Sequence, residues 1–522
     1  MSATVPPDTL GAIFERLAAT RGDYVMLRGT SGATLTHAGF LDRTTQLCAA
    51  VAARGIAQGA RVAVLSKNSI AFAEVFGLVR LGLVVVPLNW RLAASDLHRL
   101  LDDCAPEILI VDRAHLDVVR DHAATLGSLR LRLCFDGPQD GFEGYEAFLS
   151  GAGAPPKWPV VAPSEPASII YTSGTTGRPK GAVISHRGAL ANMRAAQAEL
   201  LQLSPGDRAL AVMPFFHVGG LWYHFLAAVS AGCETTILPE FAPTTVLETL
   251  KRDRITVVHL VPTMIDALLT HPGFAPGDLP GLCRIFYAGS PMPEALLRRA
   301  MAALEGCEFL QAYGSTEAGV VSALTPLDHR RALQDNAGPL LRSCGRPVAG
   351  CEVRVAGAHP EIGIGEIEVR SDGIFDSYWR RPDATQEVLD GGWVATGDLG
   401  RLDPDGYIFL IDRKNDMIVT GGENVFPTEV EGHLLRIDGV AEAAVFSTPH
   451  PRWVEQVTAA VVPTPGARLD AADIAARLRA DLAPYKCPKE IFFADRLPRN
   501  GAGKVVRAEL RKLYASGKEM VG

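Results

Sequence analysis

The sequence predicts an α/β protein, with a large N-terminal domain of layered sheets and helices and a small α+β C-terminal domain. Three observations predict this fold. The 522 residues exceed what one hydrophobic core usually organises, so at least two domains are expected. Strand-like and helix-like patterns alternate over roughly the first four hundred residues, which is typical of βαβ layers. After residue 360 the pattern changes to alternating strands and glycine turns.

The expected elements follow one another in this order along the chain. Runs rich in β-branched residues predict strands at 61–65, 83–87, 107–112, 255–262 and 283–290, and helical patterns cover 70–82 and 293–304. Turns that carry ligand residues are expected where strands end, at 172–180, 287–291 and 313–317. An alternating strand at 363–370 and a turn and strand at 403–413 come next. The boundary is expected near 412–416, giving domains 1–412 and 413–522.

Composition excludes several classes of protein. The formal net charge is −7 and the pI is about 6.0, whereas a nucleic-acid-binding surface is basic. The nine cysteines contain no C-x-x-C pair, which indicates reduced thiols of the cytosol. The most apolar window, 69–89, contains Glu74 and Arg80 and is a poor membrane span. Because the N-terminus also lacks a signal-peptide pattern, we expect a cytoplasmic protein without a transmembrane segment.

A glycine- and hydroxyl-rich stretch, Y-T-S-G-T-T-G-R-P-K-G, occupies residues 171–181. Glycines let backbone N–H groups point into one concavity, and Lys180 adds a positive charge, so the stretch suits a polyphosphate. It is not a Walker loop, because Lys180 lies between Pro179 and Gly181 and does not open a helix. The β-favouring residues that follow indicate a loop between two strands.

Four further motifs follow in order: A-Y-G-S-T-E (312–317), T-G-D (396–398), D-R-K-N-D (412–416) and L-P-R-N-G-A-G-K (497–504). Each alone is a common turn sequence. In this order and spacing, the sequence resembles the adenylate-forming family of acyl-CoA synthetases, firefly luciferase and adenylation domains. The resemblance extends over nearly the whole chain and is greatest for fatty-acyl and aryl acyl-CoA ligases. It implies that a carboxylate attacks ATP to give acyl-AMP and pyrophosphate, and that coenzyme A then displaces AMP.

The resemblance also implies an ATP site with Mg²⁺. Its residues would be Thr172, Ser173, Gly174, Thr175, Thr176, Gly177, Lys180, Gly289, Ser290, Pro291, Ala312, Tyr313, Gly314, Ser315, Thr316, Asp398, Arg413 and Lys504. Asp398 would accept both ribose hydroxyls, and Glu317 would hold Mg²⁺. Lys504, Thr316, Glu317 and His217 would be catalytic, with Lys504 bridging the substrate carboxylate and the α-phosphate.

The second half-reaction and the acyl pocket are implied in the same way. Coenzyme A would be bound by Arg91, Gly421, Gly422, Glu423, Trp453 and Tyr485. The acyl pocket would be lined by His217, Val218, Gly219, Trp222, His259, Ala288, Gly314, Gly319 and Val320. A mobile C-terminal domain would turn about residue 415, where this chain has Asn415 and relatives usually have Asp or Lys.

The acid itself is only partly constrained. No carboxylate lies between His217 and residue 234, so a buried α-amino group would lack a partner and amino acids are disfavoured. A medium- or long-chain fatty acid is favoured, and an aryl or phenylpropenoic acid is next. Two other functions stay open: an adenylating enzyme that loads a separate acyl carrier protein, and a nucleotide-binding regulator without catalysis. The oligomeric state is also open, a homodimer included.

Overall fold

The computed structural model describes residues 8–172, 179–334, 338–360, 363–414, 416–420, 423–499 and 505–515. It divides into two compact units. The N-terminal unit comprises Met1–Val353, Val369–Thr396 and Gly406–Ile408, and the C-terminal unit comprises Arg354–Glu368, Gly397–Asp405 and Phe409–Gly522. The domain boundary expected between residues 412 and 413 and the pivot expected at Asn415 both stay predictions, because compactness alone does not show where a chain turns.

The first sheet of the N-terminal unit has nine strands in the order β16-β15-β14-β13-β12-β10-β11-β1-β2. Its strands are β1 (Val25–Arg28), β2 (Thr34–Thr36), β10 (Arg208–Ala211), β11 (Glu234–Ile237), β12 (Val257–Leu260), β13 (Arg284–Tyr287), β14 (Glu308–Ser315), β15 (Gly319–Leu324) and β16 (Arg346–Pro347). The strands from β11 to β14 are parallel, and β15 runs antiparallel to β14. The carboxyl ends of β12, β13 and β14 therefore meet at one edge.

The second sheet has eight strands in the order β19-β9-β8-β4-β3-β5-β6-β7. They are β3 (Arg61–Leu65), β4 (Val84–Pro87), β5 (Ile108–Val111), β6 (Leu131–Cys134), β7 (Glu143–Gly144), β8 (Pro166–Thr172), β9 (Lys180–Ser185) and β19 (Ser377–Tyr378). Strands β8 and β9 form an antiparallel hairpin that pairs Thr172 with Lys180. The prediction that the glycine-rich loop joins two strands is thus confirmed.

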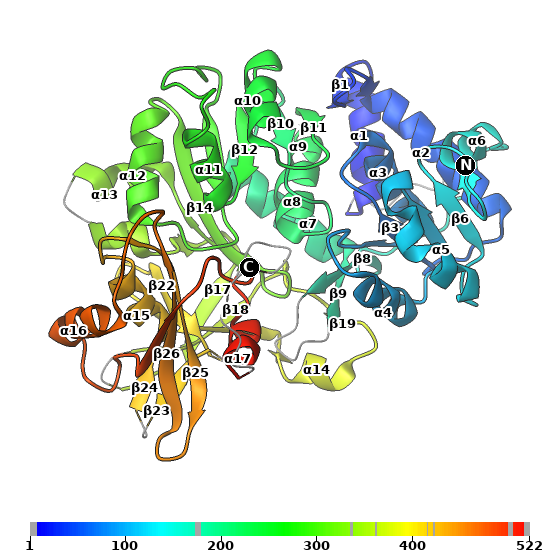
Figure 1. Ribbon diagram of the computed structural model, residues 1–522. Helices are drawn as coiled ribbons and strands as arrows, with labels where there is room; N and C mark the ends of the chain where they lie inside the picture. The colour runs from blue at the N-terminus through cyan, green and yellow to red at the C-terminus, as the bar shows by residue number, and fades with distance from the viewer. Residues whose placement is uncertain are drawn as a thin grey trace. The chain divides into compact units, whose positions relative to one another are not determined.

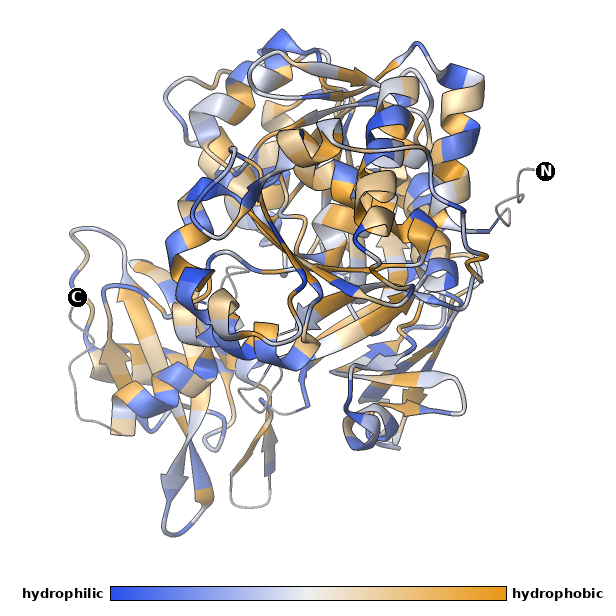
Figure 2. Cartoon of the chain, turned by 90° about the vertical axis from the view of Figure 1, so that its right-hand side faces the viewer, coloured by the Kyte–Doolittle hydropathy of each residue, from blue (hydrophilic) through white to orange (hydrophobic). Residues whose placement is uncertain are grey.

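Helices flank both sheets, as Figure 1 shows for α10, α11 and α12 beside β10, β12 and β14. The inner strands are mostly hydrophobic, whereas the helices are banded with hydrophilic residues (Figure 2). The helices of this unit are α1 (Leu10–Arg21), α2 (His37–Ala53), α3 (Ile70–Val75), η1 (Phe76–Leu81), α4 (Ala94–Cys104), η2 (Arg113–His115), α5 (Leu116–Thr125), α6 (Tyr145–Ser150), α7 (His186–Ala195), η3 (Ala196–Leu201), α8 (Val218–Gly220), η4 (Leu221–Phe225), α9 (Leu226–Ser230), α10 (Pro243–Arg252), α11 (Pro262–Leu269), α12 (Glu294–Ala303), α13 (Pro326–Gln334), η5 (Gly338–Arg342) and α14 (Pro382–Gln386).

One predicted helix, 70–82, is an α-helix followed by a tighter 3₁₀ segment, α3 and η1. The change of winding comes where Gly77 packs against α2, since a Cβ at Gly77 would lie 2.3 Å from Cβ of Thr44. The two charges in this apolar window are buried and paired. Arg43 and the Tyr145 hydroxyl donate to Glu74, and Arg80 donates to Glu15. No helix among the described residues is long and apolar enough to cross a membrane.

The C-terminal unit is built largely on a sheet with the order β24-β23-β26-β25, in which β27 also pairs with β26. Its elements are β23 (Ile418–Thr420), β24 (Glu423–Val425), α15 (Pro427–Leu434), β25 (Val440–His450), β26 (Val454–Pro463), α16 (Ala471–Asp481), β27 (Glu490–Phe493) and α17 (Arg507–Ala515). A further sheet has the order β17-β18-β21-β20, with β22 beside β21. These strands are β17 (Glu352–Ala356), β18 (Gly365–Arg370), β20 (Leu389–Asp390), β21 (Trp393–Leu402) and β22 (Ile408–Arg413). The predicted α/β fold class, with a smaller α+β unit, is confirmed.

Candidate active site

Glu317 is the point where three distant segments of the N-terminal unit meet. Its Oε1 accepts hydrogen bonds from the Thr172 hydroxyl at 3.1 Å and from the Tyr378 hydroxyl at 2.8 Å. Thr172 ends β8 in the second sheet, whereas Glu317 lies in the turn between β14 and β15 of the first sheet. The start of the glycine-rich loop is therefore joined to the A-Y-G-S-T-E motif. The sequence predicted both motifs, but it gave no sign of Tyr378.

Lys180 lies on the other side of the same loop. Its Nζ is 5.0 Å from the centre of the Tyr378 ring, a cation–π distance. The predicted residues Ser173, Gly174, Thr175, Thr176 and Gly177 lie outside the described part of the chain. The described ends of the loop thus place a cation, a hydroxyl and a carboxylate within one small region. Such a set suits phosphate groups accompanied by a hard cation.

Glu317 is the one carboxylate that is predicted to hold Mg²⁺. No group of three or more His, Cys, Asp or Glu side chains suited to a metal occurs among the described residues. Mg²⁺ is commonly held by one or two carboxylates together with substrate phosphates and water. Glu317 therefore fits a Mg²⁺ that arrives with a nucleotide, and does not fit a metal held by protein alone.

The predicted adenine and α-phosphate residues follow the strand ends of the first sheet. Gly289, Ser290 and Pro291 come directly after β13, while Ala312, Tyr313, Gly314 and Ser315 belong to β14, and Thr316 follows it. The Ser315 carbonyl accepts a hydrogen bond from the Tyr223 hydroxyl at 3.0 Å, and the Ser315 hydroxyl accepts one from the Ala318 N–H. Tyr223 thereby fixes this strand end to η4.

Gly319 shows why small residues occupy the turn after Glu317. Its φ is +71°, and a Cβ there would lie 2.5 Å from Asn192 Oδ1 and 2.5 Å from the Gly373 carbonyl oxygen. Asn192 also accepts from the Val320 N–H at 2.9 Å and donates to the Gly373 carbonyl. Asn192, which the sequence analysis missed, thus fixes a backbone turn that only glycine fits.

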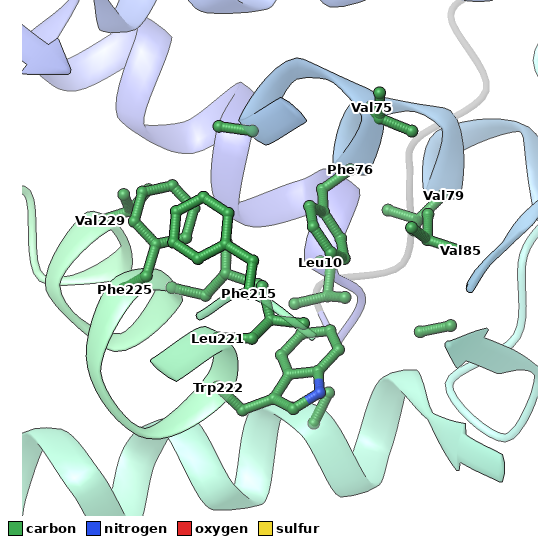
Figure 3. Close-up of a cluster of buried hydrophobic side chains, with 14 of the residues drawn as sticks. Leu10, Val75, Phe76, Val79, Val85, Phe215, Leu221, Trp222, Phe225 and Val229 are labelled. Carbon is green, nitrogen blue, oxygen red and sulfur yellow. The ribbon is translucent and has the colours of Figure 1, made fainter. Parts of the chain in front are cut away.

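Six of the nine predicted acyl-lining residues lie on or next to η4, β12 and β13, and the other three, Gly314, Gly319 and Val320, lie on β14 and β15. Val218 and Gly219 begin the helical segment that leads into η4 after His217, and Ala288 follows β13. His259 on β12 stacks on Phe286 with ring centres 4.3 Å apart, and its Nδ1 lies 3.2 Å from the Gly219 carbonyl oxygen. Trp222 is fully buried with its ring 6.0 Å from that of Phe76, among Leu10 and Leu221 (Figure 3).

Five buried histidines make the folded chain sensitive to acid. Burial lowers the pKa of His37, His186, His224 and His329 to about 4, and that of His259 to about 3. A lowered folded-state pKa gives stability that is present above the unfolded pKa of about 6.5 and lost as the pH falls below it. Each such residue then contributes a slope of about 1.4 kcal/mol per pH unit. We expect the melting temperature to fall between pH 7 and pH 5; equal values at both would contradict this.

Asp398 and Arg413, the two predicted ATP residues of the C-terminal unit that the structure describes, contact each other. Arg413 Nε lies 2.7 Å from Asp398 Oδ1, and the Asp398 side chain is only 8% exposed. The Gly397 turn before Asp398 is fixed by its N–H to Glu366 at 3.1 Å, and Lys414 also pairs with Glu366. Asp398 is thus held as a carboxylate beside a guanidinium. The sequence analysis missed Glu366, because E-I-E resembles any exposed strand.

The residues predicted to bind coenzyme A are dispersed over both units. The Arg91 guanidinium lies over the rings of Trp90 and Phe216. In the C-terminal unit Trp453 stacks on His450 with ring centres 4.1 Å apart, while Tyr485 is 37% exposed and Glu423 begins β24. Gly421, Gly422, the predicted hinge Asn415 and the catalytic Lys504 lie outside the described residues. Their roles stay predictions.

Comparison with known protein families gives two matches. The family model described as AMP-binding enzyme matches residues 14–379, and the model described as AMP-binding enzyme C-terminal domain matches residues 429–504. The first match alone covers more than half of the chain. It contains Thr172, Glu317 and Tyr378, and the second match ends on Lys504.

Relatives with similar sequences cover nearly the whole length of this chain. An indoleacetate–CoA ligase of Aromatoleum aromaticum is 38% identical over 491 residues, which is 92% of this chain and 93% of that protein. A fatty acid–[acyl-carrier-protein] ligase of Streptomyces coeruleorubidus is 36% identical, over 92% of each chain. The crystal structure of ATP-bound MatB from Rhodopseudomonas palustris superposes with a TM-score of 0.86 at 30% identity, over 97% of this chain and 99% of that one. The chain therefore belongs to the AMP-binding enzymes, the adenylate-forming ligase family.

Proposed function

We propose that this enzyme is an AMP-forming carboxylate–CoA ligase, which converts a carboxylic acid first to acyl-AMP and then to acyl-CoA. The observation that carries the proposal is the convergence of Thr172, Glu317 and Tyr378, with Lys180 beside them. It joins the predicted phosphate loop to the predicted nucleotide motif across two sheets. Activation of a carboxylic acid by ATP requires a site that binds a polyphosphate together with Mg²⁺, and a lysine beside the Glu317 carboxylate suits such a site.

The residues of the proposed site divide the first half-reaction between binding and charge stabilisation. Lys180 and the Thr172 hydroxyl bind the β- and γ-phosphates, and Glu317 holds Mg²⁺, which when bound neutralises phosphate charge. Asp398 accepts hydrogen bonds from the ribose hydroxyls, because an ionised carboxylate is acceptor-only. No protein nucleophile is needed, since the substrate carboxylate is itself the nucleophile and AMP becomes the leaving group. Lys504 stabilises the charge that develops on the α-phosphate.

The acid is proposed to be neutral and largely apolar beyond its carboxylate. The predicted lining residues are small, aromatic or apolar, and they include no Asp, Glu, Lys or Arg. This favours a fatty acid of medium or long chain, or an aryl acid, over an amino acid. The two relatives named above include one protein named for indoleacetate and one named for a fatty acid, so neither class is set aside.

The second candidate differs only in the acceptor of the acyl group. The relative from Streptomyces coeruleorubidus is named as a ligase to an acyl carrier protein, at nearly the same identity as the CoA ligase from Aromatoleum aromaticum. In that case the pantetheine thiol would arrive on a carrier, and free coenzyme A would be a poor acceptor. Trp453 and Tyr485 in the C-terminal unit would then face a protein instead of a nucleotide.

A panel of carboxylic acids with ATP, Mg²⁺ and either coenzyme A or a phosphopantetheinylated carrier protein tests both candidates. Pyrophosphate release reports the first half-reaction, and mass spectrometry of the thioester reports the second. Acyl-CoA formation supports the proposal. Acyl-AMP formation followed by transfer to the carrier alone supports the second candidate, and absence of pyrophosphate release with every acid contradicts both.

A further inference from the structure

His224 has hydrogen-bonding capacity that the described protein does not use. It lies on the π-helical segment η4, its side chain is fully buried, and neither Nδ1 nor Nε2 has a partner among the described residues. A buried polar atom without a partner is destabilising, and most buried polar groups in proteins are satisfied. π-Helical turns of this kind are frequent at functional sites.

His259 adds a second unmatched atom beside it. Its ring centre lies 6.1 Å from that of His224, and its Nε2 also has no partner within the described residues. Burial lowers the pKa of both rings, so both are neutral at physiological pH. In a neutral ring whose Nδ1–H donates to the Gly219 carbonyl, Nε2 is an acceptor. The pair therefore leaves one donor and one acceptor on His224 and one acceptor on His259.

A different buried histidine shows what a purely structural imidazole looks like in this protein. His329 on α13 is also fully buried, but its Nδ1 lies 2.7 Å from the Thr325 carbonyl oxygen and its Nε2 lies 2.8 Å from the Tyr287 hydroxyl. Both of its nitrogens are satisfied. His37 and His186 are also buried, and each has an Nε2 without a partner among the described residues, whereas in His224 both nitrogens lack one.

The position of the pair places it in the acyl region of the proposed site. His259 contacts Gly219, and it pairs in register with Phe286 near the strand ends that carry the nucleotide residues. Tyr223, next to His224, donates to the Ser315 carbonyl. A hydroxyl group carries both a donor and an acceptor, so one hydroxyl can match the Nε2 acceptor of His259 and the N–H donor of His224. A carbonyl or an N–H group matches only one side of this set.

We propose that His224 and His259 bind a hydroxyl group on the tail of the acid, so that the substrate is a hydroxylated fatty or aryl carboxylic acid. The inference rests on the proposed function and narrows its substrate class. A site built to hydrogen-bond a substrate hydroxyl discriminates strongly against the analogue without it, because the buried groups are then left unpaired.

Matched pairs of acids test the inference: 4-hydroxyphenylacetic with phenylacetic acid, 4-hydroxycinnamic with cinnamic acid, and 12-hydroxydodecanoic with dodecanoic acid. For the full-length enzyme we expect kcat/KM for pyrophosphate release to favour the hydroxylated member of at least one pair by about 10- to 100-fold. In His224→Phe this preference should fall to within about threefold, and the melting temperature should stay equal or rise, because unmatched polar atoms are removed. His224→Gln, which keeps a donor and an acceptor, should retain part of the preference.

His329→Phe is the matched control. It removes an imidazole that is satisfied by protein, so it should lower the melting temperature and leave the preference between paired acids unchanged. Equal use of both members of every pair by the wild-type enzyme would mean that the rings hold an internal water only, and it would overturn the inference while the proposed ligase function stood. A lower melting temperature for His224→Phe with unchanged preference would likewise assign His224 to the core and overturn it.

Discussion

Lys504→Ala is expected to reduce acyl-AMP formation by about 100-fold or more, the scale of one preorganised donor to a developing oxyanion. The lysine is implied to bridge the substrate carboxylate and the α-phosphate, where negative charge redistributes as the bond forms. Charge stabilisation of this kind acts on kcat more than on the binding of ATP. Pyrophosphate release with a saturating acid measures it directly.

The second half-reaction separates this role from a general loss of structure. Because Lys504 is proposed to serve only the adenylation step, thioester formation from supplied acyl-AMP should remain within a few-fold of wild type. Lys512→Ala is the matched control, because Lys512 is an exposed lysine on the neighbouring helix α17. Equal losses in both half-reactions of Lys504→Ala, or a comparable loss in Lys512→Ala, would show the assignment to be wrong.

Local pattern was enough to predict strands that are buried on both faces. The strands at 61–65 and 107–112 contain uninterrupted apolar runs, and the structure has β3 and β5 there. The hairpin at Thr172 and Lys180 was predictable because β-favouring residues flank the loop on both sides. The helix at 70–82 was only partly right, because its second half packs closely on α2, and such tertiary contacts are not encoded in periodicity.

The contacts within the candidate site could be predicted from the sequence less well than the strands. Each motif could be recognised in the sequence. No sequence pattern predicted that Thr172 contacts Glu317, or that Tyr378, 61 residues after Glu317, also binds it. Tyr378 lies in S-Y-W-R, which contains neither a turn glycine nor a charge spacing that marks a ligand site. Asn192, Tyr223 and His224 were missed for the same reason, since a polar residue inside an apolar helix pattern looks like an interruption. Side-chain convergence is a property of the three-dimensional fold.

Arg507 was missed because its surroundings in the sequence are basic and favour a solvated helix face. The structure instead places it partly buried within the C-terminal unit, where its side chain is 16% exposed. Its guanidinium donates to Glu431 at 2.7 Å, to Asp416 at 3.1 Å and to the Val445 carbonyl at 2.9 Å. Burial raises the pKa of Glu431, and the charge of Arg507 opposes this rise. In the sequence, Arg507 follows Lys504 by three residues, and Asp416 follows the predicted hinge Asn415 directly.

Arg507→Ala is therefore expected to destabilise the C-terminal unit by about 3 kcal/mol, the lower end of the range for breaking a buried ion pair. The loss arises because Glu431 and Asp416, whose side chains are only 15% and 24% exposed, lose their shared partner. Arg507→Lys should recover only part of the stability, since an ammonium cannot reproduce the planar fork that contacts three acceptors. Hydrogen exchange of the full-length protein, followed by mass spectrometry, measures the loss in peptides from α15, β25 and α17.

The control for Arg507 is another arginine pair of the same unit. Arg499 pairs with Glu442, but these side chains are 39% and 38% exposed, and pairs this exposed contribute about 0 to 1 kcal/mol. Arg499→Ala should thus leave exchange in α15 and β25 nearly unchanged. The double variant Arg507→Met, Glu431→Gln should be less destabilised than Arg507→Ala, because it leaves no unpaired charge at position 431. Similar rates of hydrogen exchange in Arg507→Ala and Arg499→Ala would show that Arg507 is a surface residue in solution. Faster exchange in the Arg507 variant alone would show that Arg507 holds the start of α17, and the segment after Lys504, against the sheet.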